Sequence, residues 1–206
     1  MATMRLKYIL VFILAGLAAV LGLAYVVSRG FSARDEPTAA EALLARQLRH
    51  MAVPRAAREM TNPVPNDPAV VAEAMEHFAD HCATCHANDG SGNTAIGKGL
   101  YPKPPDMRQA DTQNLSDGEL YYIVHNGVRF TGMPAFGEEI GNEQDKESWD
   151  LVHFIRHLPD LTDDEAAKMK KMNPKSPMET AQEERMRKFL QGDDSQPAEV
   201  SHEHHQ

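Results

Sequence analysis

Two cysteines and a histidine stand close together in the run Cys82-Ala83-Thr84-Cys85-His86. Two thiols at this spacing can each add to a vinyl group of one haem, and the histidine that follows can then give its imidazole to the iron. Three other interpretations stay open: a redox-active dithiol, half of a zinc site, and a chance match. The dithiol would need a β-α-β context, which is not visible, and the zinc site would need further ligands, although the chain has only 2 cysteines.

A haem held by His86 needs a second ligand on the opposite face of its iron. Met133 is the strongest candidate, because it stands in the run Thr131-Gly132-Met133-Pro134-Ala135-Phe136, 47 positions after His86. Glycine and proline on either side favour a loop that holds the sulfur at a fixed point. Most of the 11 methionines must instead fill space in the core, and Met107 is the one serious competitor.

The elements that position these residues are expected to be helices, since no segment alternates with the two-residue period of a strand. Asp67 is predicted to cap a helix that has Pro68 in its first turn and runs to about His81. The many Gly, Pro, Asn and Asp residues between 87 and 115 predict a loop. The cysteine motif is therefore expected just beyond the end of a helix.

Capping boxes and prolines mark the ends of the later helices. These helices are expected at residues 116–127, at about 143–158, at 162–174 and at 178–190, and a polar tail follows from Gly192. The predicted fold class is all-α with long loops.

The N-terminal residues 1–28 predict a transmembrane anchor. From Tyr8 to Val27 the chain carries no charge for 20 residues, and at about 1.5 Å per residue this length crosses about 30 Å of hydrocarbon. A cleaved signal would have a shorter apolar region with a small-x-small site after it, for which Val26-Val27-Ser28 is a weak match. A buried core helix is the third alternative. Basic residues precede and follow the span, so charge alone does not orient it.

The overall charge excludes one class of partner. The chain has 21 Lys and Arg against 30 Asp and Glu, a net charge of −9, and no basic patch that would bind the phosphates of a nucleic acid. Aromatic residues make up only 6% of the sequence, which leaves room for a non-protein group in the core.

Taken together, these motifs resemble those of the class I c-type cytochromes, the small monohaem electron-transfer family. The resemblance covers about Asp67 to Asp160. It is carried by Cys82–His86, by Pro-Lys-Pro-Pro-Asp-Met at 102–107, by Gly-Met-Pro-Ala-Phe at 132–136 and by an aromatic final helix. The resemblance implies the class I cytochrome c fold and one covalent haem c. We expect an N-terminal transmembrane helix and a helical C-terminal extension in addition to this fold.

Residue roles follow from the same resemblance. Phe78 and Ala74 would pack where the first helix of the domain crosses the last one, which carries Trp149 and Phe154. A carbonyl of Pro104 or Pro105 would accept a hydrogen bond from the ring N–H of His86 and so fix the imidazole.

Three further residues are predicted to contact the haem through their own chemistry. Arg108 and Arg129 flank the expected pocket and offer guanidinium donors to a haem propionate, while Tyr101 offers a hydroxyl. A surface position is the alternative for each. Met107 is also predicted to contact the haem.

The remaining histidines have less specific interpretations. His77 and His81 are expected at the surface, and His125 at the dipole of a helix C-terminus. His153 and His157 are a possible metal pair or a solvated helix face. In the tail, His202, His204 and His205 are possible weak ligands of copper or zinc, and adventitious binding or none is the alternative.

The chain is thus divided into residues 1–28 (anchor or uncleaved signal), 29–67 (helical and Pro-rich tether), 68–160 (haem domain) and 161–206 (helical extension with a His-containing tail). The predicted function is one-electron transfer between redox partners, without catalysis. Because this family attaches its haem outside the cytoplasm, the haem domain is expected on the periplasmic side of a bacterial cytoplasmic membrane. The alternatives are an electron-accepting subunit of a dehydrogenase or other oxidoreductase complex, and a haem sensor with an open sixth site.

Overall fold

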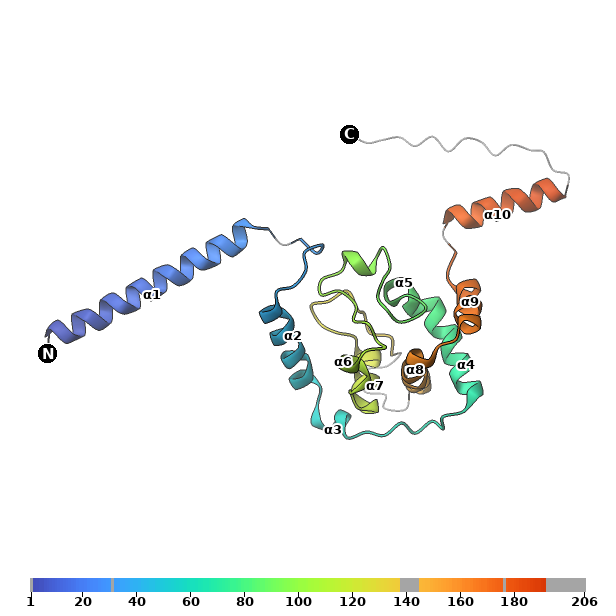
Figure 1. Cartoon of the computed structure of the whole chain (residues 1–206), viewed down its shortest axis with the longest axis horizontal. Coiled ribbons are helices and arrows are strands. Elements are labelled where there is room, and N and C mark those ends of the chain that lie inside the picture. Colours follow the sequence, from blue (N-terminus) through green and yellow to red (C-terminus); the bar gives the residue numbers. More distant parts are fainter. Residues whose placement is uncertain (1, 31, 138–144, 176, 192–206) are drawn as a thin grey trace.

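The computed structural model describes residues 2–30, 32–137, 145–175 and 177–191. Every regular element in these residues is a helix, which confirms the all-α prediction. Figure 1 shows a globular body, from which α1 (Ala2–Ser28) and α10 (Pro177–Leu190) extend in different directions. The predicted metal-binding tail with His202, His204 and His205 lies outside the described residues.

The centre of the body is the crossing of α4 (Pro68–His77) and α8 (Lys146–His157). Each helix begins at an aspartate, Asp67 or Asp145, whose carboxylate accepts a backbone N–H from the first turn. Ala74 is buried, as expected for a small residue where two helices cross. The rings of Phe78 and Phe154 lie 5.0 Å apart between centroids, which confirms the predicted aromatic contact.

The first helix of the domain does not end near His81, and the prediction was wrong at this point. Helical backbone continues from α4 through a π-helical turn, η1 (Phe78–Cys82), into α5 (Ala83–His86). It ends at Ala87, which adopts a φ of 61°. The π turn accommodates an extra residue in one turn of helix. The cysteine motif therefore lies within helical backbone and not in the loop that follows.

The segment predicted as a loop, 87–115, contains two short turns of helix, η2 (Gly97–Gly99) and α6 (Ala110–Gln113). The next helix, α7 (Asp117–Asn126), begins at the predicted capping box. Ser116 Oγ accepts from the N–H of Glu119 at 3.1 Å, and Glu119 Oε2 accepts from the N–H of Ser116 at 2.9 Å. Gly127, with a φ of 65°, ends the helix as expected.

Arg156 on α8 ties these elements together. Its Nε donates to Asp117 Oδ1 at 3.0 Å and its Nη1 donates to the carbonyl of Gln113 at 2.6 Å. Nearby, Tyr121 of α7 stacks on Trp149 of α8 with ring centroids 4.1 Å apart. These contacts fix α7 against α8, and the two helices form one side of the pocket described below.

The chain before α4 packs on the body rather than only linking it to the anchor. After α2 (Ala39–Ala52), α3 (Arg55–Arg58) approaches α7 so closely that a Cβ on Gly118 would lie 1.8 Å from the carbonyl oxygen of Ala57. Asn62 Nδ2 donates to the carbonyl of Trp149 at 2.9 Å, and the carbonyl of Val64 lies 2.8 Å from His153 Nε2. The domain boundary at residue 67 stays a prediction.

Part of the C-terminal extension also belongs to the body. After η3 (Leu158–Asp160), α9 (Asp163–Met172) begins at the predicted capping box of Thr162 and buries Met169 in the core. Just after α9, Asn173 accepts from Asn88 Nδ2 at 2.8 Å and donates from its own Nδ2 to the carbonyl of Ala79 at 3.4 Å. The helix α9 therefore backs the helical segment that carries the cysteines.

The anchor prediction agrees with the form of α1. Residues Lys7–Ser28 form one helix that is long and apolar enough to cross a membrane, and none of it is buried in the body. A signal sequence near the N-terminus would satisfy the same criteria.

Candidate functional site

A small, mostly apolar pocket lies between the cysteine helix, α7, α8 and the loop that follows α7. Its walls come from segments far apart in the sequence, and they include one histidine, one cysteine and two methionines. The lining residues are Phe78, Cys82, His86, Met107, Val124, Met133, Phe136, Leu151 and Ile155. Four residues singled out in the sequence thus meet at one place: Cys82, His86, Met107 and Met133.

His86 is buried, and burial lowers the pKa of its imidazole to about 4. The ring is therefore neutral at pH 7 and retains a lone pair for a metal ion. Among the described residues its Nδ1 has no hydrogen-bond partner. A buried ring nitrogen without a partner is costly, by about 1–3 kcal/mol, and such an atom is typical of a binding site.

The two cysteines are free thiols near the same helical turn. Burial, with a smaller contribution from Cys85, raises the pKa of the Cys82 thiol to about 12, so this thiol stays protonated. Cys82 lines the pocket, while Cys85 does not. The carbonyl of Cys85 accepts from Thr94 Oγ1 at 3.3 Å, and Thr94 Oγ1 accepts from the N–H of Gly97 at 2.8 Å. The loop after the motif is thereby closed onto the cysteine helix.

Met133 lies in a loop with hydrogen bonds of its own. The N–H of Val128 donates to the carbonyl of Met133 at 3.1 Å, and the N–H of Met133 donates to Thr131 Oγ1 at 3.1 Å. Thr131 Oγ1 also donates to the carbonyl of Val128 at 2.7 Å. The sulfur-bearing residue is therefore held on a closed turn.

The same loop is attached at its far end to α7. The N–H groups of Phe136 and Gly137 donate to the carbonyls of Val124 and His125 at 3.2 and 3.0 Å. His125 lies in the last turn of α7, as expected. Its main contact, however, is with a carboxylate and not with the helix dipole. The side chain is buried, and its Nδ1 lies 2.9 Å from Asp145 Oδ2.

Asp145 links this histidine to the start of α8. Its Oδ2 also accepts from Ser148 Oγ at 2.6 Å. Burial alone would raise the pKa of Asp145, but the hydrogen bonds from Ser148 and His125 outweigh burial and hold this pKa below its usual range. The pair therefore joins the methionine loop to both helices that border the pocket.

The hydrogen bond predicted from His86 to Pro104 or Pro105 is not present, since Nδ1 of His86 has no partner among the described residues. The carbonyl of Pro104 instead faces the backbone of Gly92, where a Cβ would lie 2.6 Å from its oxygen. Met107 is buried, and its N–H donates to the carbonyl of Gly90 at 2.8 Å, which places its side chain in the pocket wall.

The predicted propionate ligands do not line the pocket. Arg108 is occupied by Asp106, with Nε 2.8 Å from Oδ1, and by Asp89, with Nη1 3.1 Å from Oδ2. Arg129 is exposed. Tyr101 is exposed and hydrogen-bonds to Glu41 on α2. Their contact with a haem stays a prediction, to which the geometry adds no support.

The paired histidines have partners of other kinds. His77 and His81 pack against each other near the surface with ring centroids 4.8 Å apart. His153 and His157 form neither a metal pair nor a solvated face, because His153 contacts the carbonyl of Val64 and His157 lies 3.0 Å from Glu165 Oε1. In the described part of the chain no three His, Cys, Asp or Glu side chains gather as a metal site.

Sequence reasoning missed most of the apolar wall, which consists of Val124, Phe136, Leu151 and Ile155. Phe136 is the last residue of the Gly-Met-Pro-Ala-Phe motif, which by itself does not indicate that its ring lines the pocket. Leu151 and Ile155 are four residues apart on α8, which is the spacing of residues on one helix face. This spacing in the sequence could have identified both of them.

The donor set fits a haem c. The Cys82 thiol, a neutral imidazole with a partnerless nitrogen and a thioether meet at an apolar pocket, and the second thiol, that of Cys85, stands three residues further along the same helical segment. This is the chemistry that covalent attachment and axial ligation require. The cavity between these side chains measures about 20 Å³.

Comparison with known families bears on the same segment. Residues 69–155 match the family described as cytochrome C oxidase, cbb3-type, subunit III. The match includes every residue that lines the pocket. This match supports a c-type cytochrome domain at residues 69–155 and, with it, electron transfer by haem in general.

Proposed function

We propose that the protein carries one haem c, attached through thioether bonds to Cys82 and Cys85, with His86 and Met133 as the axial ligands of its iron. It passes single electrons between redox partners at a membrane. The observation that carries this proposal is the pocket in which Cys82, His86 and Met133 meet although Met133 comes from a separate loop.

Each residue has a definite task in this proposal. His86, neutral at pH 7, would offer a lone pair to the iron, and Met133 would offer its thioether. Phe78 and Leu151 exclude water from the pocket. When bound, the haem supplies a one-electron couple, because its iron changes between the ferric and ferrous states. A thioether ligand raises the reduction potential relative to a second histidine.

The position in the cell follows from the same proposal. α1 spans the cytoplasmic membrane with its N-terminus inside, so that the haem domain lies on the periplasmic side. This arrangement is supported by the apolar length of α1 and by the cysteine motif, which calls for haem attachment outside the cytoplasm.

Covalent attachment is tested on the purified full chain. The intact mass is expected to equal that of the polypeptide plus one haem, and acidified acetone should leave the pigment on the protein. The variant C82A/C85A should lose the pigment, whereas S91A, at a polar residue of the following loop, should keep it. Extraction of the haem from the unmodified chain would contradict the proposal.

A second candidate function is that of an electron-accepting subunit in an oxidoreductase complex. It is favoured by the description of the matching family, which names an oxidase subunit. It also agrees with the exposed apolar side chains of α10, among them Met178, Phe189 and Leu190. Solubilisation of native membranes in mild detergent tests it: a stable complex that contains the full chain supports a subunit, and migration of the chain alone supports a free carrier.

A further inference from the structure

The helix α2 presents its charged side to the body. Arg46 Nη1 lies 2.8 Å from Asp111 Oδ2, and His50 Nδ1 lies 2.9 Å from Glu119 Oε1 on α7. Glu41, near the start of the helix, hydrogen-bonds to Tyr101. None of the residues in α2 is buried. Polar contacts therefore hold this helix on the body, and the body does not cover its apolar side chains.

The opposite side of α2 is apolar and exposed. Leu44, Leu48 and Met51 fall within about 60° of one another at about 100° per residue, and Leu43 lies about 80° from Met51, at the edge of this face. Their exposed fractions are 56% for Leu43, 60% for Leu44, 54% for Leu48 and 72% for Met51. We call these four residues the α2 stripe. An exposed apolar face of this kind on a helix marks a surface that binds a protein, a membrane or a ligand.

Chain connectivity limits what can cover the α2 stripe. The apolar helix α1 ends at Ser28, and α2 begins at Ala39. The ten residues between them reach at most about 35 Å when fully extended. In Figure 1, α2 lies on the side of the body nearest to α1. If α1 is in a bilayer, as proposed above, α2 cannot leave the neighbourhood of that bilayer.

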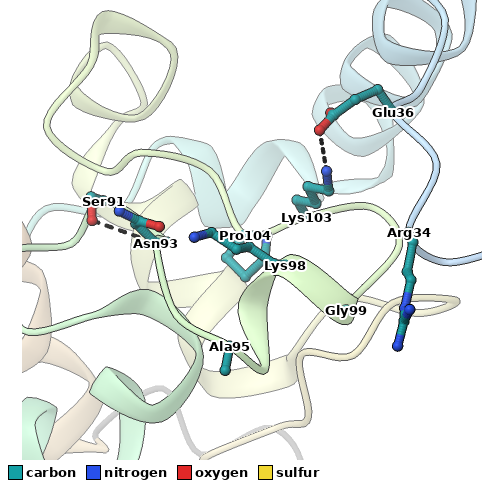
Figure 2. A pocket seen from close by; sticks show the side chains of 10 residues that line it. Arg34, Glu36, Ser91, Asn93, Ala95, Lys98, Gly99, Lys103 and Pro104 are labelled. Atoms are coloured by element: carbon teal, nitrogen blue, oxygen red, sulfur yellow. Dashed lines mark hydrogen bonds and ion pairs between the residues drawn. The ribbon is translucent and has the colours of Figure 1, made fainter.

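The charge of this segment favours an anionic lipid surface. Residues 29–58 contain six arginines against three carboxylates, although the whole chain has a net charge of −9. Figure 2 shows Arg34, Lys98 and Lys103 around an open hollow beside the start of this segment, where Lys103 pairs with Glu36. Basic residues near the bilayer surface are attracted to anionic headgroups.

We propose that the α2 stripe lies in the surface of the anionic bilayer that holds α1, and that α2 thereby holds the haem domain against the membrane. The inference rests on the membrane anchoring in the proposed function but not on the haem ligands. An amphipathic helix with basic flanks and a leucine face binds membranes in this way. When α2 is docked in this way, the haem domain has a fixed orientation relative to the membrane and does not move freely at the end of a flexible linker.

The test uses the full chain in nanodiscs of phosphatidylcholine with phosphatidylglycerol, in two variants with one added cysteine each, L48C and M186C. Position 186 on α10 is a matched control, since Met186 is 55% exposed and Leu48 is 54% exposed. The cysteine added at position 48 is expected to react with a membrane-impermeant maleimide at least about tenfold more slowly than the one at position 186. Peptide mass spectrometry assigns the label to its position, and L44C is a second variant from the stripe, in case L48C fails to fold.

Equal rates at positions 48 and 186 in these nanodiscs would overturn the proposal. Protection at position 48 that arises only in native membranes would also overturn it, because a protein and not the lipid would then cover the stripe. The visible spectrum of each sample reports the haem separately. Protection at position 48 in a chain without haem would contradict the proposed haem attachment while supporting the docking of α2.

Discussion

His86 and Met133 reach one pocket from separate segments, and local backbone features hold each of them there. His86 is the last residue of α5, directly before Ala87 with its positive φ. Met133 follows Gly127, which ends α7 with a φ of 65° and turns the chain toward the pocket. A Cβ on Gly127 would lie 2.5 Å from the carbonyl carbon of Pro134. The position of the methionine therefore depends on a glycine at 127.

Gly127→Ala should lower the free energy of unfolding by about 1–3 kcal/mol, because alanine is strained at this φ and its Cβ meets Pro134. Thermal unfolding of the haem-loaded protein measures the change. Gly99→Ala is the matched control, since no atom lies within 4 Å of a Cβ at that position. Equal unfolding temperatures for the two variants would contradict this account of the turn.

Residue types revealed the candidate ligands because few side chains can bind iron or add to a vinyl group. The sequence did not show the partners of the other polar residues. Arg108 has Asp106 two positions away, a short-range partner that could have been found. His125 has Asp145, which is distant in the sequence and becomes a neighbour only when α7 packs on α8. Such pairs depend on tertiary structure, which no local pattern specifies.

At the scale of elements, the pair of His125 and Asp145 connects the methionine loop, α7 and α8. Asp145 caps α8 and contacts His125, whose carbonyl accepts from Gly137 at the end of the loop. Both side chains are largely withdrawn from water, at 5% and 9% exposure. Loss of the carboxylate would remove a cap and leave a buried imidazole without this partner.

Asp145→Ala should therefore destabilise the protein by about 2 kcal/mol or more, beyond the roughly 1 kcal/mol expected from a helix cap alone. Asp67→Ala is the matched control, because Asp67 caps α4 from an exposed position. Chemical denaturation gives both values. If the two variants are equally stable, the contact with His125 contributes nothing.

The same carboxylate predicts a dependence on pH. Its pKa is lowered in the folded chain, so its contribution is complete above the ordinary pKa of an aspartate and is lost as the pH falls through the folded value. The stability difference between the unmodified protein and Asp145→Asn should accordingly shrink as the pH falls below about 4. A difference that stays constant down to a pH of about 2 would contradict this reasoning.

Helix starts were predictable, and the continuation of α4 was not. Asp67, Ser116 and Thr162 cap helices as their sequences indicate, because a cap is a local interaction of a few residues. The π turn at Phe78–Cys82 has no composition signal. It reflects packing of Phe78 on Phe154 and of α9 on η1, which are contacts between distant segments.

For the whole molecule, charge is the property that acts over distance. A net charge of −9 attracts cations and repels anions during encounters with redox partners. The segment between the anchor and α4 looked like a tether because proline is frequent there, but composition could not show that Asn62 and Val64 contact α8. The sequence thus predicted the anchor and the domain, while their arrangement required the structure.

Oppositely charged small reagents test the role of charge. Reduction by a cationic ruthenium ammine should slow at least about tenfold as salt rises from low to physiological and higher concentrations, because screening weakens the attraction. Reduction by an anionic iron cyanide should instead become faster. Stopped-flow spectroscopy of the haem gives both rates. The same salt dependence for both reagents would contradict steering by the acidic surface.

The far-red sulfur–iron band of the ferric protein tests most directly the proposed ligation of the iron by His86 and Met133. Met133→Ala should lose this band and bind carbon monoxide when reduced, while Met107→Leu, at the other methionine of the pocket, should keep the band and exclude carbon monoxide. A band that survives in Met133→Ala, or one that disappears in Met107→Leu, would contradict the assignment of Met133 as the ligand.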